Sequence, residues 1–228
     1  MPGATNGSST SLWMDTATVP VFPPLAGNLE AGVCVIGAGI AGLTTAYLLA
    51  QEGLDVVVID ALGVGAGETG RTSAHFFPPD EWYGGIEHRF GQSQARLVAG
   101  SYAHALELVE GIVRREGIDC GFERLDGYLV GASALRPDGN GSNPGSYPGT
   151  YANPSDGARA RLQHERDAAV RAGVAAELLP AVPGLAYATG PCVRFPAQAQ
   201  FQPLQYLAGL ARAFTARGGR IHGATHAH

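Results

Sequence analysis

One stretch limits the possible folds more than any other: VCVIGAGIAGLTTAYLLAQEGLDVVVID, which runs from Val33 to Asp60. Val33–Ile36 and Val56–Ile59 are short continuous apolar runs, as in the buried strands of a parallel sheet. Between them, residues 40–52 carry apolar side chains at helical spacing, and Gly53 is a suitable residue to end a helix. The order strand, helix, strand predicts an α/β fold.

Three glycines, Gly37, Gly39 and Gly42, form a G-x-G-x-x-G motif between the first strand and the helix. The first glycine allows a tight turn, the second lets a pyrophosphate approach the backbone, and the third lets helix and strand pack closely. The helix then begins with unpaired N–H groups and the positive end of its dipole, which favour a phosphate. The motif predicts a dinucleotide site.

Asp60 follows directly after the second strand. A carboxylate at this place can accept hydrogen bonds from both ribose hydroxyls of an adenosine, and it would repel a 2′-phosphate, which disfavours NADP. The alternative is a glycine-rich turn between strand and helix that binds no ligand.

A second glycine-rich segment, GAGETGRTSAHF, comes soon after Asp60. A simple NAD domain would continue quickly into another helix and strand. A loop of small residues suits a longer ligand, which extends past the pyrophosphate toward a flavin ring. An ordinary surface loop is the alternative.

The rest of the chain is predicted from periodicity and turn residues. Phe122–Gly131 should form two short strands around an Asp126-Gly127 turn. Residues 136–157 consist almost entirely of turn-forming residues, and we expect a flexible surface loop there. The other expected elements are helices over residues 92–116, 158–172 and 203–217, and strands beginning at Cys192 and Arg220.

Composition excludes several classes of protein. The chain has 228 residues, a net charge of −5, 45% hydrophobic and 15% charged residues, which indicates a globular protein without a nucleic-acid surface. Its three cysteines, Cys34, Cys120 and Cys192, are far apart and fit reduced thiols in the cytoplasm; their spacing predicts no metal site. The N-terminus lacks the pattern of a signal peptide, and no apolar run is long enough to span a membrane.

The segments 35–60 and 65–76, together with FPAQAQFQPLQYLAGLARAFTARGGRI, resemble the FAD-dependent oxidoreductases of the D-amino-acid oxidase superfamily. This group includes glycine, sarcosine and dimethylglycine oxidising enzymes. The chain is most similar to bacterial members that often carry a C-terminal Rieske domain. The resemblance covers residues 11–223 except for the loop 136–157, and three motifs in this order are more specific than the glycine motif alone.

The resemblance implies a Rossmann-like three-layer FAD-binding domain and a partial α+β substrate domain. Residues 1–29 would be an extended lead-in, residues 30–117 the first part of the FAD domain, and residues 118–201 the start of the substrate domain. Residues 202–228 would return to the FAD domain. Because the family pattern continues beyond residue 228, we expect the chain to be an N-terminal portion of such an enzyme.

The glycine motif and the resemblance together give the predicted cofactor contacts: Gly37, Gly39, Ile40, Ala41, Gly42, Asp60, Gly67, Thr72, Ser73, Ala74 and His75. His75 is a candidate for a covalent bond to flavin, as in some relatives, although a hydrogen-bonding or packing histidine is the more frequent case. No catalytic residue is assigned.

Several other side chains could have either a functional role or a purely structural one. Arg71 could contact phosphate or a substrate carboxylate, or it could be an exposed loop residue. Trp82 and Tyr83 could line the flavin or belong to the core, and Arg194 and Gln200 lie on the segment expected to face the substrate. His222, His226 and His228 resemble a metal cluster only superficially, and we expect them to form a frayed terminus.

The resemblance implies that the parent enzyme oxidises the C–N bond of a small-molecule amine or amino acid, with hydride transfer to the flavin and an unassigned electron acceptor. A non-catalytic FAD-binding fragment is one alternative. An NAD-dependent dehydrogenase is a weaker one.

Overall fold

The computed structural model describes residues 10–77, 83–131 and 156–227, and these divide into two compact units. The first comprises residues 1–75, 108–123 and 200–228, and the second comprises residues 76–107 and 124–199. These boundaries differ from the domains expected from the sequence, because residues 76–107 pack with the second unit. Tyr83, Ile86, Ala95 and Ala99 all join the core of that unit.

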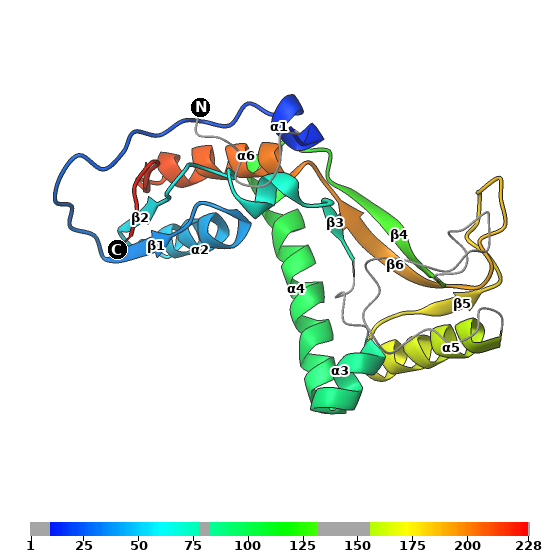
Figure 1. Ribbon diagram of the computed structural model, residues 1–228. Coiled ribbons are helices and arrows are strands. Elements are labelled where there is room, and N and C mark those ends of the chain that lie inside the picture. Colours follow the sequence, from blue (N-terminus) through cyan, green and yellow to red (C-terminus); the bar gives the residue numbers. More distant parts are fainter. Residues whose placement is uncertain (1–9, 78–82, 132–155, 228) are drawn as a thin grey trace. The chain divides into compact units, whose positions relative to one another are not determined.

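The first unit contains a parallel three-stranded sheet with the order β1-β2-β7. β1 is Val33–Ile36, β2 is Val56–Ile59 and β7 is Arg220–His222. Helices α2 (Ile40–Gln51) and α6 (Pro203–Ala216) lie side by side along this sheet (Figure 1). The predicted strand–helix–strand unit and the returning helix and strand are thus confirmed.

The strands of this sheet differ in burial, and β1 is more exposed than β2. Val35, Val58 and Ile221 are register partners on one face, and Val58 and Ile221 are buried. Ile36 and Cys34 belong to the opposite face and are exposed, Ile36 to 69%. Val57, the register partner of Cys34 on that face, is buried, so the exposure is confined to β1, which is an edge strand of the described sheet. The expectation that β1 is buried was therefore wrong, because its side chains alternate between half-buried and exposed.

The lead-in is not extended throughout, since Leu12–Thr16 forms a short helix, α1. A second short element, the 3-10 helix η1 (Glu68–Arg71), lies within the loop that follows β2. α1 contacts both η1 and α6, and Figure 1 shows α1 near one end of α6. Ser11, the N-cap of α1, is a residue type that often begins a helix. The helix itself could not be predicted, because five residues are too few to show helical periodicity.

The second unit is built on a sheet in which β3, β6 and β4 are neighbours and β5 pairs with β6. These strands are β3 (His75–Phe76), β4 (Glu123–Val130), β5 (Glu177–Leu179) and β6 (Cys192–Gln200). The helices are α3 (Tyr83–Phe90), α4 (Gln92–Glu116) and α5 (Asp156–Arg171). α4 has the bounds predicted, and its C-terminal part belongs to the first unit.

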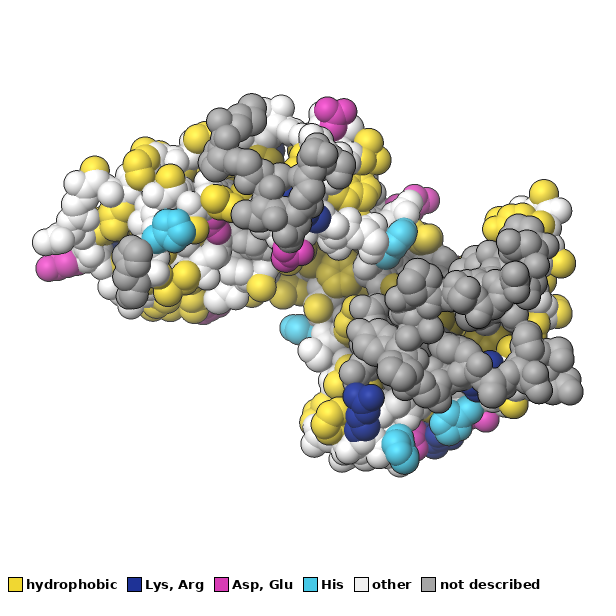
Figure 2. Space-filling model, in the orientation of Figure 1, with side chains coloured by type: hydrophobic (Ala, Val, Ile, Leu, Met, Phe, Trp, Pro, Cys, Tyr) yellow, Lys and Arg dark blue, Asp and Glu magenta, His cyan; other side chains and the backbone are white. Residues whose placement is uncertain are grey.

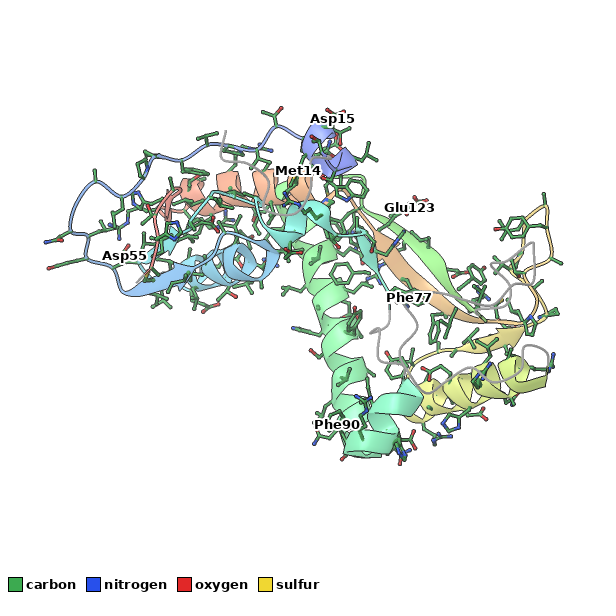
Figure 3. The ribbon with its side chains drawn as sticks, viewed as in Figure 1. Met14, Asp15, Asp55, Phe77, Phe90 and Glu123 are labelled. Atoms are coloured by element: carbon green, nitrogen blue, oxygen red, sulfur yellow. The ribbon has the colours of Figure 1, made fainter. Side chains whose placement is uncertain are left out.

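The prediction of two short strands joined by a turn at Gly127, between residues 122 and 131, was wrong. β4 is one continuous strand, and Gly127 lies in its interior rather than in a turn. A Cβ atom at this position would lie 2.2 Å from Cε2 of Phe77, which is labelled in Figure 3. The Phe77 ring also packs edge-to-face on Phe195. The glycine therefore makes room for an aromatic ring, a role that the Asp-Gly turn pattern cannot reveal.

Some calls from the sequence fall on residues outside the described ranges. These are Trp82, His228 and residues 136–155 of the predicted loop; residues 156 and 157 belong to α5. No helix within the described ranges is long and apolar enough to cross a membrane. On the face shown in Figure 2, acidic and basic side chains are scattered rather than gathered in a patch of one sign.

Replacing Gly127 with alanine should lower the free energy of unfolding by about 1–3 kcal/mol, because the Phe77 ring must move out of a packed position. Gly100→Ala is the matched control. No atom lies within 4 Å of a Cβ at Gly100, on the exposed side of α4, so this change should stabilise by about 0.5–1 kcal/mol. Denaturant unfolding of the variants and the wild type measures both effects. Equal stabilities for G127A and G100A would contradict the packing argument.

Candidate functional site

The G-x-G-x-x-G segment forms a tight turn between β1 and α2. Gly37 has a φ of +101°, a left-handed conformation that favours glycine. A Cβ at Gly42 would lie 2.0 Å from the carbonyl oxygen of Gly37, so only glycine permits α2 to begin this close to β1. At Gly39, the N-cap of α2, a Cβ would lie 3.2 Å from Oγ1 of Thr69. Gly37 and Gly42 thus meet the steric demands that the sequence motif predicts, whereas the approach of a pyrophosphate to Gly39 stays a prediction.

The carboxylate of Asp60 connects this turn to the loop after β2. Its Oδ2 accepts a hydrogen bond from the backbone N–H of Ala38 at 2.7 Å. Its Oδ1 accepts from the N–H groups of Leu62 at 2.8 Å and Gly63 at 2.7 Å. A carboxylate has about four acceptor positions, and three of them are used here. The side chain therefore fixes both loops and keeps about one position, on Oδ2, for a further donor.

The loop of residues 63–75 also contacts the glycine turn directly. The N–H of Gly65 donates to the carbonyl of Ala38 at 3.0 Å. The N–H of Ile40, at the start of α2, donates to Oγ1 of Thr69 at 3.2 Å. Thr69 was missed in the sequence analysis, which singled out the glycines and the residues from Thr72 onward. Its signal was a hydroxyl residue in the glycine-rich loop that follows the acid.

The second half of this loop is held by other contacts. Arg71 donates to the carbonyls of Ala66 at 3.1 Å and Gly67 at 3.2 Å, so its guanidinium supports the loop that contains it. The carbonyl of Thr72 accepts from Nε1 of Trp13 at 2.7 Å. Ala74 is buried and has a φ of +65°, which is uncommon for a residue other than glycine. Such strained backbone is concentrated at functional sites.

Every residue predicted to contact the cofactor lies in the first unit. Gly37–Gly42, Asp60 and the first half of the loop are brought together by the hydrogen bonds described above. Thr72, Ser73 and His75 are exposed at the end of the loop, where β3 begins.

The arrangement suits a phosphate-bearing ligand. The first N–H groups of a helix have no carbonyl one turn earlier to bond, and Ala41 and Gly42 occupy these positions in α2. The helix dipole adds a partial positive charge at the same end. The hydroxyl of Thr69 accepts from Ile40 through one lone pair, so its proton can be donated to a phosphate oxygen. The turn, the helix and the hydroxyl therefore fit a pyrophosphate.

Arg194 is the centre of an ion-pair cluster across three strands of the second unit. Its Nε contacts Oδ2 of Asp126 on β4 at 2.7 Å, and a terminal nitrogen contacts Oε2 of Glu177 on β5 at 3.2 Å. The hydrogen bond from Arg194 lowers the pKa of Asp126. With two carboxylates already bound, Arg194 is poorly suited to hold a substrate carboxylate.

The remaining predicted side chains have structural partners. Gln200 donates to Glu123 at 3.3 Å and belongs to the first unit, whereas Arg194 belongs to the second. Tyr83 is a core residue of the second unit, only 2% exposed, and its burial raises the pKa of its hydroxyl to about 12. Tyr83 also lines a cavity of about 340 Å³ in that unit, together with residues of α4 and β6. None of the predicted cofactor contacts lines this cavity.

One of the C-terminal histidines, His222, lies in a strand and not in a frayed end. His222 is the last residue of β7 and pairs with Ile59 of β2, and its carbonyl accepts from the N–H of Asp60 at 2.9 Å. Both ring nitrogens of His222 are buried, and no described residue forms a hydrogen bond with them. His226 is exposed beyond the strand. The expectation was wrong for His222, because the strand extends to it.

Asp60→Asn should lower the free energy of unfolding by about 1–3 kcal/mol in the absence of any ligand. The amide NH2 of asparagine would face one of the backbone N–H groups that the carboxylate now accepts. Asp55→Asn is the control, because Asp55 is 58% exposed and forms a surface ion pair with Arg220, which is worth about 0–1 kcal/mol. Thermal or denaturant unfolding measures both. An effect of D60N no larger than that of D55N would show that Asp60 does not hold the two loops.

Comparison with known proteins gives the family. Residues 32–228 match the family model described as FAD dependent oxidoreductase. A protein of Bacillus subtilis named as a Rieske 2Fe-2S iron-sulfur protein, YhfW, is 31% identical over 211 residues, which is 92% of this chain and 37% of the relative.

Two solved structures share the fold. L-amino acid deaminase from Proteus myxofaciens has a TM-score of 0.65 at 16% identity, with 92% of this chain and 41% of that chain covered. Glycine oxidase from Geobacillus kaustophilus has a TM-score of 0.60 at 19% identity, with 85% and 46% covered. The chain thus spans less than half the length of these proteins. With most of its length matched by the family model, the chain belongs to the FAD dependent oxidoreductase family.

Proposed function

We propose that the first unit is a Rossmann-like dinucleotide-binding unit that holds FAD, and that the protein oxidises the C–N bond of an amine or an amino acid. The observation that carries the proposal is the glycine turn at the start of α2, joined to the loop of residues 63–75 through Asp60 and Thr69. Membership in an FAD dependent family supports FAD as the dinucleotide. Solved structures of the same fold include enzymes named for amino acid deamination and glycine oxidation.

We refer to the glycine turn, the start of α2, Asp60 and the loop of residues 63–75 together as the cradle. Each part of it has a specific role in this proposal. The amides of Ala41 and Gly42 and the dipole of α2 bind the pyrophosphate, and the hydroxyl of Thr69 donates to one of its oxygens. Oδ2 of Asp60 accepts one ribose hydroxyl, rather than the two that the sequence suggested, because its other acceptor positions are filled by backbone amides. Gly67, Thr72, Ser73, Ala74 and His75 follow the ligand toward its flavin end.

FAD, when bound, supplies a flavin ring that accepts a hydride from the carbon next to the substrate nitrogen. The protein's own task is to bind and orient. His75 is exposed at the start of β3 and remains the candidate for a covalent attachment. We do not assign substrate binding to Arg194, because its ion pairs with Asp126 and Glu177 already neutralise it.

We further propose that the protein works in a reducing compartment, the cytoplasm. Its three cysteines are free thiols, two of them buried, and burial raises the pKa of both Cys120 and Cys192. A buried thiol of raised pKa has little thiolate and is a poor nucleophile. This pattern supports an unreactive, structural role for both buried cysteines.

Gly39→Val should reduce the affinity for FAD at least roughly tenfold, because a branched side chain would occupy the position of the pyrophosphate and press on Thr69. Gly27→Val is the matched control, since nothing lies within 4 Å of a Cβ at that exposed position. Fluorescence titration with FAD and with NAD measures both affinities. Bleaching of the flavin absorption band by glycine, sarcosine or other amines then tests catalysis. Equal FAD binding by G39V and the wild type, or preference of the wild type for NAD, would contradict the assignment.

Thr69→Val should weaken FAD binding roughly two- to tenfold, the effect of losing one or two hydrogen bonds. Valine keeps the shape of threonine but cannot donate to a phosphate or accept from Ile40. Thr69→Ser restores the hydroxyl and should bind FAD as the wild type does. If T69S were as weak as T69V, restoring the hydroxyl would not restore binding, and the role assigned to the hydroxyl would be contradicted.

A further inference from the structure

The short helix α1 and its N-cap, residues 11–16, contact the glycine-rich loop. α1 has five residues, none of them buried, and a helix of this length is not stable by itself. Ser11 caps it by accepting from the N–H of Met14 at 3.2 Å. Its position must therefore be held by contacts with the rest of the first unit.

Three side chains of this segment reach the loop. Ser11 Oγ donates to the carbonyl of Gly70 at 2.5 Å, and Trp13 Nε1 donates to the carbonyl of Thr72 at 2.7 Å. Met14, labelled in Figure 3, packs so closely that a Cβ at Gly70 would lie 2.7 Å from its Cε atom. The carbonyls that accept these two hydrogen bonds lie on either side of Arg71, and Gly70 directly follows Thr69.

Gln202 anchors α1 to the core of the first unit. Its Oε1 caps α6 by accepting from the N–H groups of Leu204 at 2.6 Å and Gln205 at 2.9 Å. Its Nε2 donates to the carbonyl of Trp13 at 3.0 Å and to Oγ1 of Thr16 at 3.1 Å. One side chain thus fixes the start of a largely buried helix and holds α1 against it.

The amino-acid composition of the loop does not by itself favour one conformation. Residues 65–73 include three glycines and mostly small or polar side chains, so ordering them costs conformational entropy. A loop already ordered before binding gives a higher affinity, because that cost is not incurred during binding. The contacts run without a break from α6 through Gln202 and α1 to Gly70 and Thr72, and from Thr69 to the start of α2.

We propose that residues 11–16 act as a clamp that preorganises the loop of residues 67–72 for FAD, with Trp13 and Gln202 as positioning residues. This inference rests on the proposed function. The segment before β1 would thus affect cofactor affinity through the loop, because its side chains donate to Gly70 and Thr72 and not to the glycine turn.

Two substitutions separate the clamp from general stability. Trp13→Phe keeps an aromatic ring but removes the donor to Thr72. Gln202→Glu keeps an acceptor for the N–H groups of Leu204 and Gln205, and its charge favours the start of α6, but it removes the donor to Trp13 and Thr16. Leu12→Ala is the control, because Leu12 is 64% exposed on the same helix and alanine preserves helix propensity.

The first measurement is hydrogen–deuterium exchange of the FAD-free, full 228-residue chain. Amides of residues 66–72 should exchange roughly two- to tenfold faster in W13F and Q202E than in the wild type or L12A, the effect expected for one lost hydrogen bond. Exchange within α2 and the melting temperature should stay unchanged. Faster exchange throughout the first unit, or no change in the loop, would overturn the clamp.

The second measurement is the dissociation constant for FAD. It should rise roughly two- to tenfold in W13F and Q202E and stay unchanged in L12A. A faster-exchanging loop with unaltered FAD affinity would also overturn the proposal. A wild-type chain that binds no FAD would instead contradict the proposed function, and the exchange data would still show whether α1 orders the loop.

Discussion

The geometry of the first unit depends on the carboxylate of Asp60. This side chain accepts backbone N–H groups from the glycine turn on one side and from the loop after β2 on the other. Both loops lie at the carboxyl ends of parallel strands, where α/β folds bind ligands. Because three acceptor positions face the protein, Asp60 is first a structural residue of the cradle and only then a candidate contact to ribose.

A second constraint comes from the helices that carry the cradle. Tyr47 of α2 is fully buried, its hydroxyl donates to Glu116 of α4, and the Arg217 guanidinium lies 5.1 Å from its ring centre. Arg217 also pairs with Glu116 at 2.8 Å. This cluster joins the end of α6 to α2, and near the start of α6 its residues Leu204 and Leu207 pack on Gly65 of the loop. The loop and α2 are thus both supported by α6.

Sequence reasoning predicted the elements whose periodicity is long or whose glycines are required sterically. α2, α4 and α6, the strands β2 and β7, and the demands on Gly37 and Gly42 belong to this class. Sequence reasoning failed for residues whose role is determined by tertiary contacts. Gly127 makes room for Phe77, a residue 50 positions earlier, so no local pattern distinguishes it from a turn glycine. Thr69 and Trp13 are polar contacts of a loop, and Arg194 is bound by residues of two other strands, so their partners appear only in the folded chain.

A structure of the chain crystallised with FAD would test the central claim most directly. The account predicts the pyrophosphate at the amides of Ala41 and Gly42, one of its oxygens at Thr69 Oγ1, one ribose hydroxyl at Asp60 Oδ2, and the flavin end along residues 67–75. Asp60 should still accept from Ala38, Leu62 and Gly63 in that complex. FAD bound away from the glycine turn, or an Asp60 side chain that leaves the backbone amides to reach the ribose, would contradict it.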